Sequence, residues 1–318
     1  MVCLLAASEP TALETLLQHC LIGLTNGSLF ALIAIGYTMV YGIIGLINFA
    51  HGDLFMLGSC LALSILAFLL PDPAQASALT VFLAIGLMLV VCPVFCAALN
   101  MAVDWSVYKP LRNAPKLAPL VSAIGVSFVF MNIGLFWIGP PDINFPDLVS
   151  SDNVFGADAV IRFTYKDLLV VGVTVPLMIA LTLFVRFTRL GTAMRATEQN
   201  PTAAALMGIN VNRVVALTFG IGGALAGAAS VIYGLYINTI SFQMGFQNGL
   251  YAFTAAVLGG IGSIPGAVLG GLLIGLVRSL GSAYIGERWT SALIFAILIV
   301  VLVFRPSGLL GSHAKEKV

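Results

Sequence analysis

Long apolar runs follow one another along almost the whole chain. Runs of about 18 to 25 apolar residues recur, which is the length of helix that crosses about 30 Å of hydrocarbon. We predict membrane segments at roughly 17–43, 53–70, 78–100, 119–138, 166–186, 214–237, 250–262, 266–284 and 290–304. No polar stretch is long enough for a further domain, so we predict an all-α polytopic membrane protein whose residues 1–318 form a single transmembrane domain.

Two of these segments are irregular in length. The first is long enough to be broken near Asn26 and Gly27, where an amide and a glycine interrupt the apolar run. The segment at 250–262 is too short to cross the membrane unless it continues into the next segment or dips in and returns. The sequence therefore predicts about eight transmembrane helices, with glycine-rich stretches that are broken or re-entrant.

The composition agrees with a membrane protein and argues against several kinds of site. The chain is 60% hydrophobic and 8% charged, with a mean hydropathy of +1.06. Its three histidines are far apart and its five cysteines show no metal-ligand spacing, so we expect no metal site, no catalytic residue and no cofactor in this chain. The net charge of +1 indicates no charged partner; we expect membrane lipid around the chain and no nucleic acid.

Charged residues sort by loop, and the sorting predicts an orientation in the membrane. Basic residues collect after the third segment, after the fifth and at the C-terminus, whereas the 139–165 loop is acidic. The basic positions are Lys109, Arg112, Lys116, Arg186, Arg189, Arg195, Arg213, Arg305, Lys315 and Lys317, and the acidic ones are Asp142, Asp147, Asp152 and Asp158. Loops rich in Lys and Arg stay cytoplasmic. We therefore expect an external N-terminus and a cytoplasmic C-terminus.

Polar residues interrupt the apolar sequence at GIIGLINFAHGDLFMLGS, residues 42–59. Asn48, His51 and Asp53 stand here among glycines, which include Gly52. A metal site would need a third ligand, which the stretch lacks. A proton relay stays open, because histidine titrates near neutral pH. We favour a helix break, in which the glycines loosen the chain and the Asn48 and Asp53 side chains cap freed backbone groups, with Asp53 capping the next segment.

Glycines also punctuate LGGIGSIPGAVLGGLLIG, residues 258–275, at helical spacing. One set of glycines four residues apart is Gly262, Gly266 and Gly270, and a second is Gly271 and Gly275. About one helical turn separates such positions, so each set predicts a smooth stripe that a neighbouring helix can approach closely. Pro265 removes a backbone donor, and we expect a break near 262–265 before the helix resumes. A nucleotide-binding loop is excluded, because neither GxxxxGKS nor GxxxxGKT occurs in the chain.

A short helix is predicted within the basic loop 187–213. Asn200 is a good N-cap, Pro201 suits the first helical position, and Gly208 supplies a C-terminal stop. The residues between them form a small apolar surface, which comprises Ala203, Ala204, Ala205, Leu206 and Met207. A lone short apolar helix is not stable in water, so we expect it to dock into a partner. The alternatives are a helix on the bilayer surface or one packed against the transmembrane bundle.

Several of these stretches resemble a known family. The pattern TAAxxxG at 202–208 is similar to the EAAxxxG loop of permease subunits in ABC importers, with Thr202 where that loop has Glu. Together, residues 31–59, 187–213 and 252–275 resemble the LivH-type permeases of branched-chain amino acid ABC importers. The resemblance implies a bacterial inner-membrane subunit that pairs with a LivM-type permease, two cytoplasmic ATPases that bind ATP and Mg²⁺, and a periplasmic amino-acid-binding protein. It implies a permease, not an enzyme.

The resemblance also assigns expected roles to residues. The ATPase-coupling helix would comprise Asn200, Pro201, Thr202, Ala203, Ala204, Leu206 and Gly208. The translocation path or the helix breaks beside it would include Asn48, His51, Gly52, Asp53, Gly259, Gly260, Gly262, Pro265 and Gly266. Arg278 lies inside a predicted segment; we expect it to snorkel to the outer interface, with a role at the permeation path as the alternative.

Three alternatives to a branched-chain amino acid permease stay open at this point. The first is an ion-coupled secondary transporter, which would need ionisable groups near the middle of the membrane, where only His51 and Asp53 qualify. The second is an ABC permease for related substrates such as amides or urea. The third is a channel or a structural membrane subunit, which would have no use for a docking helix.

Overall fold

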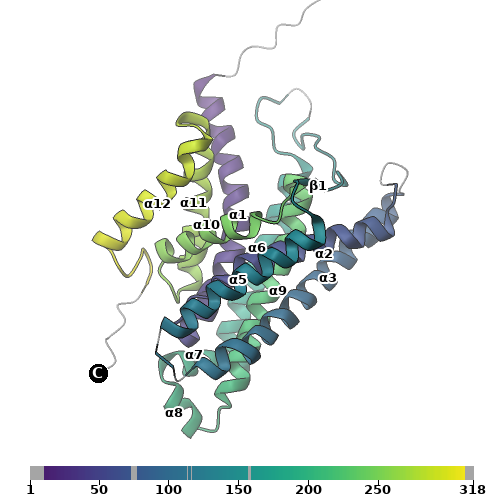
Figure 1. Cartoon of the computed structure of the whole chain (residues 1–318). Coiled ribbons are helices and arrows are strands. Elements are labelled where there is room, and N and C mark those ends of the chain that lie inside the picture. Colours follow the sequence, from purple (N-terminus) through teal and green to yellow (C-terminus); the bar gives the residue numbers. More distant parts are fainter. Residues whose placement is uncertain (1–10, 73–76, 113, 116, 157–158, 312–318) are drawn as a thin grey trace, which may run out of the picture.

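The computed structural model describes residues 11–72, 77–112, 114–115, 117–156 and 159–311 (Figure 1). Its helices are α1 (Ala12–Ile44), α2 (Ala50–Leu69), α3 (Ala78–Val103), a π-helical turn η2 (Asp104–Tyr108), α4 (Lys109–Leu111), α5 (Leu117–Ile138), α6 (Tyr165–Phe187), α7 (Arg189–Gln199), α8 (Pro201–Leu206), α9 (Val211–Ile237), α10 (Met244–Gly259), α11 (Ile264–Tyr284) and α12 (Glu287–Phe304). Among the described residues, eight helices are long and apolar enough to cross a membrane. The chain is an all-α polytopic membrane protein, as predicted.

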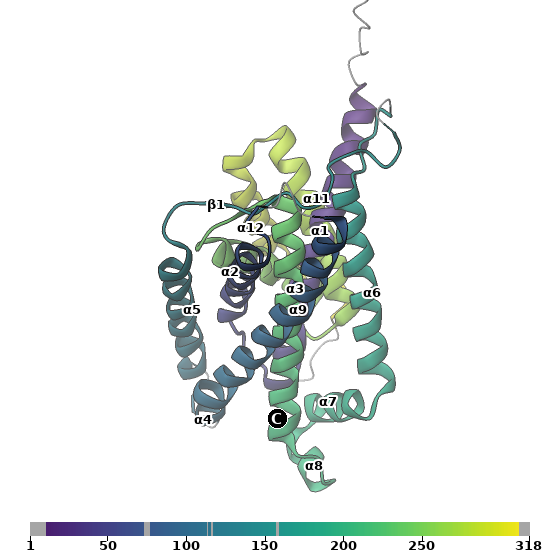
Figure 2. The same ribbon diagram turned by 90° about the vertical axis from the view of Figure 1, so that its right-hand side faces the viewer.

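Two short strands mark one end of the bundle. Strands β1 (Ile143–Asn144) and β2 (Thr239–Ile240) pair antiparallel, with Ile143 opposite Ile240. The pair ties the loop before α6 to the connection between α9 and α10, and we call this end the strand end. Helices α4, α7 and α8 lie at the opposite end, the α8 end (Figure 2).

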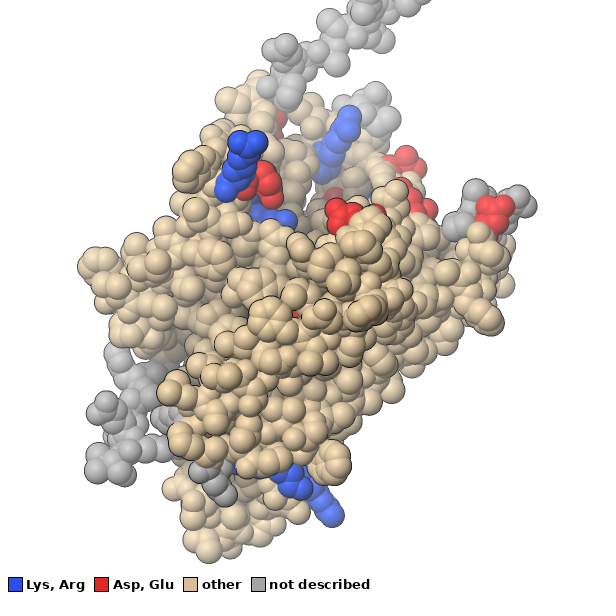
Figure 3. Space-filling model, viewed as in Figure 1, with Lys and Arg blue, Asp and Glu red and all other residues tan. Residues whose placement is uncertain are grey.

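The basic loops and the acidic loop predicted from the sequence lie at opposite ends. The described basic positions of α4, α7 and the start of α9 lie at the α8 end, whereas the described acidic positions of the 139–165 loop lie at the strand end. On the face drawn in Figure 3, the lower end carries Lys and Arg side chains, whereas the upper end carries Asp and Glu side chains together with further Lys and Arg side chains. The predicted positions Lys116, Asp158, Lys315 and Lys317 lie outside the described residues.

Helix α1 is continuous, so the predicted break near Asn26 and Gly27 is wrong. It runs for 33 residues from Ala12 to Ile44. Gly27 lies inside the helix at its crossing with α11, where an added Cβ would lie 2.7 Å from the Cα of Leu272. The glycine therefore permits close helix packing and does not interrupt the helix.

Helix α10 corresponds to the short predicted segment at 250–262, which was expected either to continue into the next segment or to dip into the membrane and return. Its 16 residues extend over about 24 Å, less than the hydrocarbon thickness. It runs from β2 toward the α8 end, and the chain then reverses at residues 260–263 into α11. A Cβ at Gly270 would lie 2.0 Å from the carbonyl oxygen of Ala255, so α10 and α11 pack as a tight antiparallel pair. The segment thus neither continues into α11 nor crosses at full length.

The core surrounds α1 and α9, which are the most buried of the long helices. Helix α1 packs on α11, α9 and α10, and α9 packs on α3 and α2. The outward faces of α3, α5, α6 and α12 carry large exposed apolar side chains, for example Phe82, Phe136, Ile179 and Val303. Such faces suit contact with lipid or with another membrane subunit.

Candidate functional site

The helix break predicted within 42–59 is confirmed, and it lies at residues 45–49. Helix α1 ends at Ile44, and Gly45 takes a left-handed conformation with φ +66°, which favours glycine. Helix α2 then begins at Ala50, beside α1 about two turns before the end of that helix. The rings of Tyr37 and His51 lie 4.7 Å apart, edge to face. Because Tyr37 is seven residues before the end of α1, the start of α2 lies about 10 Å inside that end.

Asn48 satisfies the polar groups that this break leaves inside the bundle. Its side-chain Oδ1 accepts the backbone N–H of Ala50 at 3.1 Å and the hydroxyl of Tyr108 at 2.9 Å. Its Nδ2 donates to Asn100 Oδ1 at 3.2 Å, and Asn100 donates in turn to the Phe219 carbonyl at 2.6 Å. Buried backbone at membrane depth needs such partners. The network joins the start of α2 to α3, η2 and α9, and the predicted capping by Asn48 is confirmed.

Replacing Asn48 with leucine is expected to destabilise the protein by about 2–4 kcal/mol, because Tyr108 and Asn100 would each lose a buried partner. Thermal unfolding of the purified chain in detergent measures this effect. Asn132→Leu is the matched control, since the exposed Asn132 side chain bonds only to the Phe128 carbonyl of its own helix. Equal midpoints for the two variants would show that the network contributes nothing to stability.

Asp53 and His51 lie on different sides of α2. Asp53 lies in the first turn of the helix and accepts a hydrogen bond from the Ser127 hydroxyl of α5. The expectation that Asp53 caps the helix is therefore wrong, because Phe49 occupies the N-cap position and the Asp53 carboxylate is directed to α5. The His51 ring packs against α1, where a Cβ at Gly36 would lie 2.4 Å from its Nε2. Within the described structure the His51 ring nitrogens have no hydrogen-bond partner, so no hydrogen bond joins these two side chains. The described residues hold no group of three or more His, Cys, Asp or Glu that could bind a metal.

Gly52 allows α2 and α10 to touch through their backbones. A Cβ at Gly52 would lie 2.4 Å from the Gly245 carbonyl oxygen and 2.7 Å from the Gly249 Cα. Real Cβ contacts of this length do not occur, so any side chain at Gly52 would push the two helices apart. The start of α2 and the short helix α10 therefore form one glycine-lined crossing inside the bundle.

The predicted break near residues 262–265 is confirmed. Gly260 and Gly262 have φ +106° and +96°, and the Ser263 hydroxyl caps α11 by accepting the Gly266 N–H at 3.2 Å. Pro265 occupies the first turn of α11. The backbone N–H groups of Leu309 and Leu310 donate to the carbonyls of residues 258 and 259 at 2.9 Å each. The segment after α12 thus covers the end of α10.

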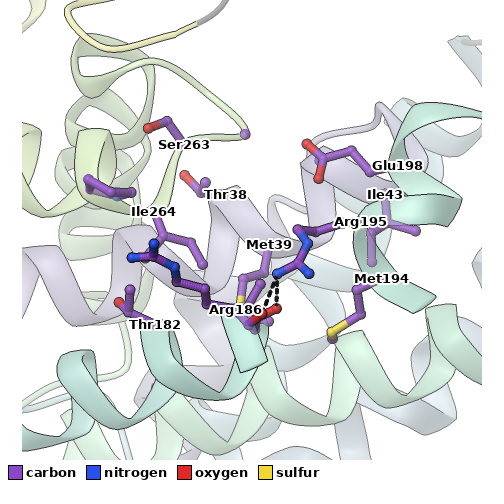
Figure 4. A pocket seen from close by; sticks show the side chains of 14 residues that line it. Thr38, Met39, Ile43, Thr182, Arg186, Met194, Arg195, Glu198, Ser263 and Ile264 are labelled. Atoms are coloured by element: carbon purple, nitrogen blue, oxygen red, sulfur yellow. Dashed lines mark hydrogen bonds between the residues drawn. The ribbon is translucent and has the colours of Figure 1, made fainter. Parts of the chain in front are cut away.

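A cavity of about 310 Å³ opens beside this turn at the α8 end (Figure 4). The ends of α1 and α6, the helix α7, and residues 262–265 line it. Arg195 of α7 donates to the backbone carbonyls of Val185 and Arg186, which fixes the corner between α6 and α7. The carboxylate of Glu198 lies close to Gly42 and Gly262. The cavity therefore separates the α6–α7 corner from the α10–α11 turn.

The short helix predicted at 200–208 is confirmed as α8. The Asn200 side chain accepts the Ala203 N–H at 3.0 Å, Pro201 is the first helical residue, and Gly208 ends the helix with φ +85°. The helix projects beyond α7 at the end of the molecule (Figure 2). It contacts the neighbouring helices α7 and α9, but its residues other than Ala204 are exposed, so it is not tucked into the transmembrane bundle as one alternative proposed.

The exposed surface of α8 differs in one position from the predicted apolar surface. Leu206 and Met207 are 84% and 83% exposed, whereas Ala204 is 4% exposed. Ala204 faces the rest of the chain, and its carbonyl accepts the Ile209 N–H. It therefore anchors the helix, and the surface open to a partner is formed by the remaining residues, above all Leu206 and Met207.

Comparison with known proteins assigns the chain to a family. The model described as "Branched-chain amino acid transport system / permease component" matches residues 20–302. The chain belongs to this family. Members of the family with a similar sequence include the high-affinity branched-chain amino acid transport system permease proteins BraD of Pseudomonas aeruginosa and LivH of Escherichia coli strain K12. Each is 42% identical over 304 residues, which is 95% of this chain and 98% or 97% of the relative.

A more distant relative is the autoinducer 2 import system permease protein LsrD of Escherichia coli strain SMS-3-5. It is 29% identical over 214 residues, 63% of each chain. No solved structure matches the chain.

The sequence did not predict several residues that partner the polar side chains of the site. Asn100, Tyr108 and Ser127 partner the predicted polar residues, but each lies within an apolar helix far away in sequence. The buried Asp104 pairs with Arg112 at 2.7 Å across η2, which holds Tyr108 toward Asn48. The only signal in the sequence was a polar residue inside an apolar run, and such a residue does not indicate which side chain it contacts.

Proposed function

We propose that this chain is the transmembrane permease subunit of an ATP-driven importer that moves branched-chain or related apolar amino acids across the bacterial inner membrane. The observation that carries the proposal is α8. This short helix is capped at both ends and projects from the bundle with Leu206 and Met207 exposed. The family of the chain supports the same function. The chain has no nucleotide-binding motif of its own, so a separate subunit would supply ATP hydrolysis.

The proposed partners follow from this function. They are a second, LivM-type permease subunit, two cytoplasmic ATPases that bind ATP and Mg²⁺, and a periplasmic amino-acid-binding protein that delivers the substrate. The α8 end would face the cytoplasm, because the basic residues of α4, α7 and α9 gather there and positive loops stay cytoplasmic. The described chain ends at Gly311 beside Gly260, in the half of the bundle that carries the α10–α11 turn, so the C-terminus would also be cytoplasmic.

The structure offers a route by which ATPase movement could reach the membrane segments. Helix α8 follows directly on α7, and Arg195 fastens α7 to the end of α6. Across the cavity from this corner lies the glycine turn that joins α10 to α11. A shift of α8 would therefore move the α6–α7 corner relative to α1 and the α10–α11 turn. Packed elements with two discrete arrangements are what transmit such motions.

The ion-coupled alternative has less support. Carriers of that kind use ionisable groups that pair near the middle of the membrane. Asp53 pairs with the Ser127 hydroxyl, and His51 packs against α1 on another side of α2. An ABC permease for amides or urea would share α8 and differ only in its substrate contacts.

Uptake of labelled leucine into sealed vesicles tests the proposal. We expect uptake only when the second permease, the ATPases and the leucine-loaded binding protein are all present, with ATP on the side of the membrane that carries the ATPases. Competition by valine and isoleucine, and by an aliphatic amide or urea, assigns the substrate class. Leucine uptake by this chain alone, driven by a proton or sodium gradient, would refute an ATP-driven importer.

A further inference from the structure

Arg278 carries a positive charge into the membrane-spanning part of α11. The helix runs from Ile264 to Tyr284, and Arg278 stands six residues before its end at the strand end. An arginine at this height could extend its side chain either toward the interface or toward the middle of the membrane. Helical side chains point back toward the N-terminus of their own helix, which for α11 is the α8 end.

The contacts of Arg278 place its guanidinium near the middle of α11. Its Cζ lies 5.5 Å from the centre of the Phe30 ring and 5.3 Å from the centre of the Tyr251 ring. Phe30 of α1 precedes Ala31, which touches Gly271, so this part of α1 lies level with the centre of α11. The expected snorkelling of Arg278 to the outer interface is therefore wrong.

The contacts of helix α10 independently place the Arg278 guanidinium at the same height along α11. Ala255 touches Gly270, and α10 runs antiparallel to α11. Tyr251, one turn earlier in α10, thus lies level with about residue 274, the midpoint of α11. The two aromatic rings that hold the guanidinium are therefore both close to the centre of the helix pair.

Among the described residues, no carboxylate forms a salt bridge with Arg278. Asp104 pairs with Arg112, and Asp147 pairs with Lys166. The two rings stabilise the cation through their faces. Such contacts leave the N–H groups in the plane of the guanidinium able to donate, and these groups match a carboxylate in a two-point hydrogen bond.

Further polar groups line the surface beside Arg278. The Tyr251 hydroxyl bonds to the Ser291 hydroxyl of α12 at 2.6 Å, and the exposed Gln247 of α10 donates to Tyr251 at 3.4 Å. Polar side chains in the spanning region face protein or water, because lipid leaves them without partners. The surface formed by Gln247, Arg278 and Ser291, with the buried Tyr251 hydroxyl beneath it, is thus suited to a path for a polar solute between this chain and a second subunit.

We propose that Arg278 binds the carboxylate of the transported amino acid in the middle of the membrane, on the surface between α10, α11 and α12. This inference rests on the proposed function and adds a substrate-binding residue to it. The carboxylate supplies the missing counter-charge of the guanidinium. The buried Phe30 and Tyr251 rings hold the guanidinium in place.

The ratio of leucine imported to ATP hydrolysed tests this role in the assembled transporter. With saturating leucine-loaded binding protein, Arg278→Gln is expected to lower the ratio about tenfold, the effect of losing a charge-assisted hydrogen bond. ATP hydrolysis stimulated by the binding protein and the thermal midpoint should stay unchanged. Arg278→Lys, which keeps the charge without the two-point geometry, should give an intermediate ratio. The matched control is Arg288→Gln at the strand end of α12, which should behave as the wild type.

The outcomes separate the two proposals. A wild-type transporter that imports no leucine contradicts the proposed function. A wild type that imports leucine, together with an Arg278→Gln variant that keeps the wild-type ratio, overturns the role of Arg278 alone. Loss of ATP hydrolysis and of thermal stability in Arg278→Gln and Arg278→Lys alike would also overturn it, because that pattern assigns Arg278 to packing.

Discussion

Replacement of Leu206 with aspartate is expected to abolish binding of the ATPase subunits and import, while the permease itself stays folded. The Leu206 side chain is 84% exposed at the tip of α8, so a carboxylate there costs the isolated chain little. In a docked interface the same carboxylate would be buried against an apolar groove without a partner. Loss of such a central contact weakens association by about 2–4 kcal/mol, or roughly 30- to 1,000-fold.

Co-purification of tagged ATPases with the permease measures this effect, and vesicle uptake reports its consequence. Met207→Leu is the conservative control, because it keeps an apolar side chain on the same surface and should bind as the wild type. Ala204→Asp supplies the contrast, since Ala204 is buried and its replacement should lower the thermal midpoint. The docking role of α8 is disproved if Leu206→Asp retains the ATPases at wild-type levels.

Local signals in the sequence were sufficient to predict α8, but not which of its faces is free. Asn200 and Gly208 set the ends of the helix through bonds within a few residues, and these are visible in a short window of sequence. The burial of Ala204 depends on how α8 lies against the preceding and following helices. That is a tertiary property, and the residues of α8 alone do not encode it.

The same distinction holds for the helix break and the membrane glycines. Gly45 and Asn48 act locally, and the break that they predict is present. The partner of Asp53 is Ser127 on α5, 74 residues away, so a helix cap was the nearer but wrong inference. Gly27 presents the same difficulty. A glycine in a membrane helix is compatible with a break or with close packing, and only the position of Leu272 decides between them.

The side-chain direction of Arg278 in α11 is a third property that the sequence did not predict. Its position near the end of a predicted segment favoured snorkelling, which is the common behaviour of such residues. The direction of its side chain depends on two rings, Phe30 and Tyr251, that come from separate helices. The functional inference about Arg278 therefore required the packing of α1, α10 and α11, while the family resemblance required only the sequence.

Replacement of Gly275 with alanine is expected to destabilise the protein by about 2–4 kcal/mol, although it adds one methyl group. Helices α1 and α11 cross through their backbones here: a Cβ at Gly275 would lie 2.3 Å from the Gly27 Cα, and one at Gly271 would lie 2.4 Å from the Ala31 Cα. Lipid removes the hydrophobic drive for helix association, so close van der Waals packing at such positions holds the helices together. The backbones must separate to admit the methyl group, and the contacts on both sides of the crossing weaken.

Thermal unfolding of the purified chain, compared with Gly172→Ala, isolates this packing effect. Gly172 lies within α6 and an added Cβ there meets nothing within 4 Å, so alanine should be neutral or slightly stabilising through its helix propensity. Gly275→Leu extends the series, and we expect little folded protein to accumulate in membranes. Since both alanine variants change a helical glycine in the same way, the difference between their midpoints reports the crossing itself. If the two midpoints coincide, α1 and α11 do not depend on backbone contact, and the glycine stripe of α11 has no structural role at that position.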